Sequence, residues 1–178
     1  MVSESTLIAL LFAANAFAAS PIVDAAKAGN LAAVQSLIKQ RADVNAAEAD
    51  GTTALQWAAR SDSVDMARAL LKAGADAKKA NRYGITALQL AAVNGSAPMV
   101  RLLIEAGADA NAVLPEGETI LMTASRTGRP EVLEALLDAG AQFDAREKWY
   151  GETALHWAAA ENHADAVRLL LTRGADVD

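Results

Sequence analysis

Both histidines of the chain lie in one short segment, residues 152–163, whose sequence is ETALHWAAAENH. His156 and His163 are seven residues apart, and Glu152, Trp157 and Glu161 stand beside them. Imidazole and carboxylate groups are the usual metal ligands and proton-transfer groups of proteins. Two imidazoles alone fall short of the three or four ligands of a zinc site. Whether the segment is a chemical site therefore depends on the elements that position it.

Other catalytic signatures are absent from the sequence. The chain has no cysteine, which excludes disulfides, thiolate metal sites and thiol nucleophiles. Neither a Gly-x-Ser-x-Gly nor a Gly-x-x-x-x-Gly-Lys-Ser/Thr motif occurs, and no positioned serine completes a triad with the two histidines. We therefore predict that the protein is not an enzyme and binds no cofactor or metal.

Composition and charge indicate the type of core and the kinds of partner that the protein can bind. Hydrophobic residues make up 53% of the chain but aromatic residues only 4%, so alanine and leucine dominate and the core should be helical and finely packed. The formal net charge is -6, whereas nucleic acids and anionic membranes are bound by clustered basic surfaces. The sequence predicts no nucleic-acid partner.

The N-terminal residues resemble an export signal. Leu7 to Phe17 is almost wholly apolar, and Ala16-Phe17-Ala18 has the small residues that signal peptidase reads, so residues 1–18 are a predicted signal peptide. The first six residues are atypical because they contain Glu4 and no Lys or Arg. The alternatives are an apolar helix packed on the domain and a membrane span, for which the run is too short. We expect a periplasmic or secreted protein, or a cytoplasmic one if the signal does not function.

The rest of the chain repeats itself. Thr53, Thr86, Thr119 and Thr153 each follow a Gly-x pair, and they are 33, 33 and 34 residues apart. Glycines at 74, 107, 140 and 174 recur in the same phase. The threonine hydroxyl can cap a short Ala-rich helix, and a turn at Asp62, Gly95, Gly128 or Asn162 then leads into a second helix. The second helix ends at the repeated glycine, and an extended loop follows.

This unit of helix, turn, helix and extended loop resembles the ankyrin repeat, and TALH at 153–156 differs by one residue from that family's T-P-L-H signature. A further unit begins at Ser20-Pro21, with Arg41 where the other units have glycine. The resemblance implies an all-α ankyrin-repeat solenoid of about five units over residues 20–178. The predicted repeats are 20–47, 48–80, 81–113, 114–147 and 148–178.

The repeat gives each residue of the opening segment a structural role. His156 shares its position with Gln56, Gln89 and Met122, so the resemblance implies that it packs near the helix start and bonds to backbone or loop groups. His163 lies in the turn, and no third ligand converges from a matching position. Trp157 shares its position with Trp57, which predicts partial burial between helix layers.

The resemblance also implies a protein-protein interaction module that binds a partner through the concave face of the stack, with contacts from the loop tips and the ends of the first helices. The predicted protein-binding residues are Arg60, Arg82, Tyr83, Ile85, Arg126, Trp149, Tyr150 and Glu152. The three arginines would form a row, and Trp, Tyr and Arg often dominate interface energies. Alternatively, Trp149 and Tyr150 pack on the neighbouring loop.

The partner is a protein of unknown identity, and we expect a monomer. Two other functions remain open. The repeats could be the binding arm of a longer protein with a catalytic domain beyond residue 178, or an inhibitor that occludes a partner enzyme.

Overall fold

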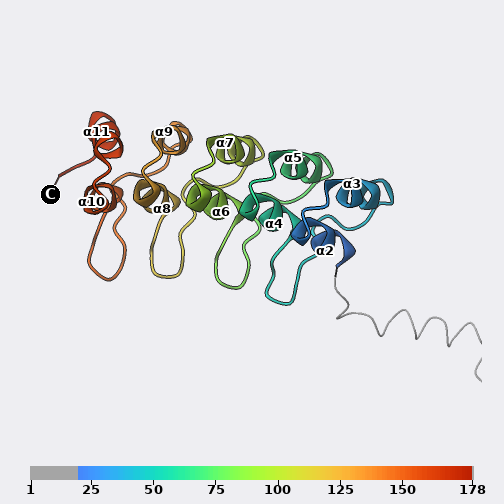
Figure 1. Cartoon of the computed structure of the whole chain (residues 1–178). Coiled ribbons are helices and arrows are strands. Elements are labelled where there is room, and N and C mark those ends of the chain that lie inside the picture. The colour runs from blue at the N-terminus through green and yellow to red at the C-terminus, as the bar shows by residue number, and fades with distance from the viewer. Residues whose placement is uncertain (1–19, 178) are drawn as a thin grey trace, which may run out of the picture.

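The computed structural model describes residues 20–177, in which ten α-helices form five pairs (Figure 1). The predicted signal peptide, residues 1–18, lies outside the described residues. The first helices of the pairs are α2 (Pro21–Lys27), α4 (Ala54–Arg60), α6 (Ala87–Asn94), α8 (Ile120–Thr127) and α10 (Ala154–Ala160). The second helices are α3 (Leu31–Lys39), α5 (Val64–Lys72), α7 (Ala97–Glu105), α9 (Pro130–Asp138) and α11 (Ala164–Thr172).

The pairs stack into two parallel rows (Figure 1). Each first helix packs on the first helices of its neighbours, and each second helix packs on the second helices beside it. We call the row of first helices the inner layer and the row of second helices the outer layer. The predicted all-α solenoid is confirmed.

The inner helices begin where the threonines predict. The hydroxyl groups of Thr53, Thr86 and Thr119 each accept a hydrogen bond from the backbone N–H three residues later. These bonds satisfy donors that a helix start leaves unpaired. Ser20 occupies the same position before α2, but its hydroxyl makes no capping bond, and Pro21 begins the helix without an N–H to satisfy.

The turns take the left-handed backbone conformation that the glycines suggested. Gly95 and Gly128 end their inner helices with φ of 67° and 65°, and Asp62 and Asn162 adopt 51° and 58° in the equivalent turns. Arg41 has a φ of 61° where the other repeats have glycine after the outer helix. A side chain in this region costs about 1 kcal/mol, so packing of the repeat must hold Arg41 in place.

The core is one continuous cluster that runs through the stack. The inner helices contribute small residues such as Ala58, Ala91 and Ala158, which are fully buried and let neighbouring helices approach closely. The outer helices contribute residues at i, i+1 and i+4, as Met66, Ala67 and Leu70 show in α5. The outer helices thus bury one face each, whereas inner helices such as α6 and α8 are buried over most of their residues.

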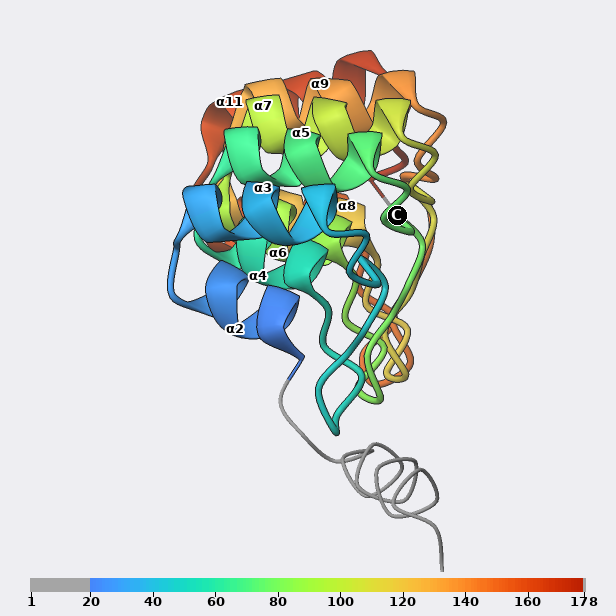
Figure 2. The same cartoon turned by 90° about the vertical axis from the view of Figure 1, so that its right-hand side faces the viewer.

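The loops between repeats form hairpins that project from the inner layer, all on one side (Figures 1 and 2). In the first of them, Glu48 N–H donates to the Thr52 carbonyl at 2.9 Å. Adjacent hairpins also join each other, since Arg82 N–H donates to the Asp50 carbonyl at 2.9 Å. No helix among the described residues is long and apolar enough to cross a membrane.

Candidate binding surface

The inner-layer helix ends and the hairpin loops make a continuous surface, which we call the inner face. The structure shows seven exposed large hydrophobic residues among those it describes. Five of them lie on the inner face: Tyr83, Val93, Val113, Trp149 and Tyr150. The other two, Leu171 and Val177, belong to the last repeat. Exposed apolar surface is thus concentrated on one side of the solenoid.

A groove of about 590 Å³ lies on this face between the first two hairpins, and we call it the Trp57 groove. Trp57 is half-buried, and its indole N–H donates to a Glu48 carboxylate oxygen at 2.8 Å. The other Glu48 oxygen accepts from Lys27 Nζ at 3.1 Å. The Lys27 ammonium and the Arg60 guanidinium lie 4.8 and 5.5 Å from the indole ring centroid. Cation-π attraction therefore holds both cations at the groove wall.

The far wall of the Trp57 groove comes from the second hairpin. The Arg82 guanidinium lies 5.0 Å from the Tyr83 ring centroid and donates to the Tyr83 hydroxyl at 3.0 Å. Asp50 closes the first hairpin, because its carboxylate accepts the Thr52 N–H at 2.9 Å. This bond, together with the charge of Arg82, holds the pKa of Asp50 below its usual range.

A second groove, of about 220 Å³, surrounds Trp157 at the equivalent position of the last repeat. We call it the Trp157 groove. The Arg126 guanidinium lies 5.3 Å from the Trp157 ring centroid and 3.8 Å from a Glu118 carboxylate oxygen. The Trp157 indole N–H is buried, and no described residue accepts a hydrogen bond from it. Leaving a buried donor unpaired costs about 1–3 kcal/mol.

The hairpin that contains Trp149 and Tyr150 explains the missing acceptor. Glu147 stands where Glu48 stands in the first hairpin, since each begins its loop with an N–H bond to the residue before the threonine. Here the carboxylate turns into the loop and accepts N–H groups of Trp149 and Tyr150 at 2.6 Å and of Glu152 at 3.1 Å. Burial raises the pKa of Glu147, but these bonds outweigh it and the pKa lies below 4.5.

His156 has a contact at the helix start, as the repeat implies, whereas no contact was predicted for His163. His156 Nδ1 accepts the Thr153 N–H at 3.3 Å and lies 2.8 Å from the Thr153 hydroxyl. His163 directly precedes α11, and its Nε2 lies 3.0 Å from the Arg126 carbonyl oxygen. No group of three or more possible metal ligands occurs among the described residues.

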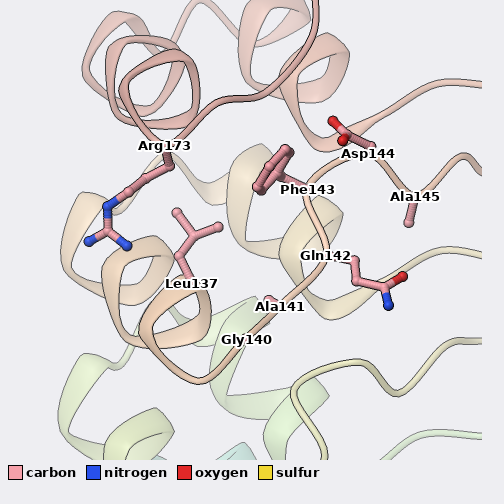
Figure 3. A pocket seen from close by; sticks show the side chains of 8 residues that line it. All are labelled: Leu137, Gly140, Ala141, Gln142, Phe143, Asp144, Ala145 and Arg173. Carbon is pink, nitrogen blue, oxygen red and sulfur yellow. The ribbon is translucent and has the colours of Figure 1, made fainter.

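A third hollow, of about 560 Å³, lies away from the inner face, between the turn after α9 and the end of α11 (Figure 3). Leu137 and Phe143 provide its apolar walls, and Arg173 stands at its rim. The Arg173 guanidinium already pairs with Asp138 at 2.9 Å. None of the sequence-predicted binding residues lines this hollow.

The structure divides the predicted binding residues among three places. Arg60, Arg82, Tyr83 and Ile85 line the Trp57 groove. Arg126 and Glu152 line the Trp157 groove, so the predicted row of three arginines is split. Trp149 and Tyr150 lie at a hairpin tip with exposed fractions of 75% and 87%, which leaves little of either ring to pack on a neighbouring loop.

Sequence reasoning missed the two tryptophans and Lys27 as groove residues. It placed both tryptophans between helix layers, and they do pack on the core, but one side of each ring lines a groove. A signal was present in the spacing. Lys27 precedes Trp57 by 30 residues and Arg126 precedes Trp157 by 31, so each cation lies in the last turn of the inner helix before its tryptophan.

The stacked helix pairs and their aligned hairpins define a helical-repeat solenoid. A family model described as ankyrin repeats (3 copies) matches residues 22–114 and 107–178, so this chain belongs to the ankyrin repeat family. No curated protein matches the chain. Ankyrin repeats generally act as protein-protein interaction modules and are typically not catalytic.

Proposed function

We propose that this protein binds a partner protein through its inner face, with contacts from the hairpin tips and from the grooves at Trp57 and Trp157. The observation that carries the proposal is the clustering of exposed hydrophobic residues on this side of the stack. Large exposed apolar patches on soluble proteins commonly mark interaction sites.

The hairpin with Trp149 and Tyr150 is suited to be an anchor. Both rings are exposed, while both backbone N–H groups are held by the Glu147 carboxylate. A fixed backbone lowers the conformational entropy that binding must remove. Aromatic rings bury much area with few rotatable bonds, so they often dominate interface energies.

The test is affinity capture from a cell extract with matched baits. We expect a Trp149→Ala/Tyr150→Ala bait to lose partners that the wild-type chain recovers. A Leu171→Ala bait changes an exposed residue of α11 away from the hairpins and should keep them. Helical circular dichroism melts should be nearly the same for all three. Recovery of the same proteins by all baits would contradict the proposed face, and a collapsed melt would assign the two aromatic residues to folding.

We also propose that the protein acts outside the cytoplasm, on the basis of the apolar run and Ala-x-Ala site in residues 7–18. An alkaline phosphatase fusion to the C-terminus would be active only if the chain is exported. An inactive fusion, with full-length protein in the cytoplasm, would reject the export.

A further inference from the structure

The cations of the two grooves differ in what they pair with. Within residues 20–177, Lys27 pairs with Glu48 and Arg126 lies beside Glu118. Arg60 and Arg82 form no ion pair with any described carboxylate, although both line the Trp57 groove and both are exposed. The chain as a whole carries a net charge of -6, yet the Trp57 groove brings these two guanidinium groups together on one surface.

Both guanidinium groups are already held in place. Arg60 lies against the Trp57 ring, and Arg82 lies against the Tyr83 ring and donates one hydrogen bond to its hydroxyl. A guanidinium has five N–H donors, so each group keeps donors for an incoming acceptor. Pre-positioning reduces the rotamer entropy that binding would remove from a free arginine.

The acidic groups of the groove are already engaged. The Glu48 carboxylate is shared between Lys27 and the Trp57 indole, and the Asp50 carboxylate accepts the Thr52 N–H. Asp50 lies near Arg82 but forms no ion pair with it. Among residues 20–177, no carboxylate pairs with Arg60 or Arg82 in this groove, while Ile85 and Leu90 give it apolar walls.

We propose that the Trp57 groove binds an acidic segment of the partner protein, with one aspartate or glutamate carboxylate received by Arg60 and Arg82. This inference rests on the proposed function and names the chemistry of the partner at one part of the inner face. Arginine binds carboxylates through paired, charge-assisted N–H bonds, which favours an acidic side chain over an amide of the same shape. The Trp157 groove is not expected to show this preference, because Glu118 already lies beside Arg126.

The experiment is a selection of random dodecapeptides, displayed on phage, against the whole chain. We expect the enriched peptides to carry aspartate or glutamate and to lose at least about tenfold in affinity for an Arg60→Gln/Arg82→Gln variant. Replacing the acidic residue of a selected peptide by its amide should cause a similar loss. An Arg68→Gln/Arg101→Gln variant, which removes two exposed arginines of the outer helices α5 and α7, is the matched control and should bind the same peptides as the wild type.

Each outcome separates the two proposals. Peptides that bind the inner face without acidic residues, or that bind the Arg60→Gln/Arg82→Gln variant as well as the wild type, would overturn the acidic-segment proposal alone. An equal loss in the Arg68→Gln/Arg101→Gln variant would also overturn it, because the effect would then be general electrostatics. If no peptide bound the chain, or if binding ignored every inner-face variant, the proposed function itself would fail. Unchanged melts of the variants would show that folding is not responsible.

Discussion

Trp57 and Trp157 occupy the same position in two repeats, yet their surroundings differ. A cation from the last turn of the preceding inner helix lies against each indole ring, Lys27 against Trp57 and Arg126 against Trp157. The Trp57 N–H is paired with Glu48, whereas the Trp157 N–H has no acceptor. The repeat thus fixes the position of an indole but not its hydrogen bonding.

The difference originates in the hairpin before each tryptophan. In the first hairpin two carboxylates have different partners. Glu48 accepts the indole N–H of Trp57, and Asp50 accepts the Thr52 N–H within the loop. The hairpin before Trp157 has one extra residue, and Trp149 stands two positions after Glu147, where Asp50 stands after Glu48. The Glu147 carboxylate is bound to the N–H groups of that loop and not to the indole, and the Trp149 and Tyr150 rings are exposed.

The last two repeats are joined by a different contact, at the turn between helices. The His163 ring covers Gly128 and lies 3.0 Å from the Arg126 carbonyl oxygen. A Cβ atom at Gly128 would overlap this ring, and the residue has a φ of +65°. We expect Gly128→Ala to lower the free energy of unfolding by about 2–3 kcal/mol, from backbone strain and overpacking together.

Chemical denaturation measures this loss, and Gly95→Ala is the control. Gly95 has a similar φ of +67°, but the nearest atoms that a Cβ there would meet belong to the linear Arg129 side chain, with its Cγ at 2.8 Å, and not to a ring. Its loss should be about 1 kcal/mol, from backbone strain. Equal losses in the two variants would show that the His163 ring moves aside freely and does not join the repeats.

Substitutions of the two groove tryptophans should have the next largest effect on the free energy of unfolding. Trp57→Phe removes a donor from Glu48, so we expect it to cost about 1 kcal/mol for the hydrogen bond. Trp157→Phe removes a buried donor that has no acceptor among the described residues, so it should lose no hydrogen bond and should relieve part of the cost of about 1–3 kcal/mol of the unpaired N–H. Paired denaturation curves measure the contrast. Equal losses would mean that the Trp157 N–H finds an acceptor in solution.

The sequence predicted the elements well because the repeat places each residue in a known register. The capping role of Thr53, the left-handed turn at Asn162 and the structural contact of His156 all follow from position within a unit. The grooves could not be predicted in this way. Lys27 contacts Trp57 across a repeat boundary. Glu147 bonds to its own loop and not to the Trp157 indole, in a hairpin that has one extra residue.

The smallest effect concerns the charge of Glu147, which should make its hairpin sensitive to acid. Its folded pKa is lowered, so the stabilisation is fully present above the ordinary value of 4.5 and is lost as the pH falls through the lowered pKa. In a variant that keeps Trp149 as the sole tryptophan (Trp57→Phe, Trp157→Phe), the fluorescence of Trp149 should change in that range. Adding Glu147→Gln should abolish the change, whereas adding Glu116→Gln, in the neighbouring hairpin, should leave it.

The pH of this acid transition tests whether the Glu147 carboxylate holds its own loop, unlike Glu48 in the first hairpin. A transition at or above pH 4.5, or one that survives Glu147→Gln, would mean that the carboxylate does not hold the loop in solution. Glu147 would then be free to reach the Trp157 indole as Glu48 reaches Trp57, and Trp157→Phe should cost as much as Trp57→Phe. The fluorescence and denaturation experiments are therefore independent measurements of which N–H groups the Glu147 carboxylate accepts.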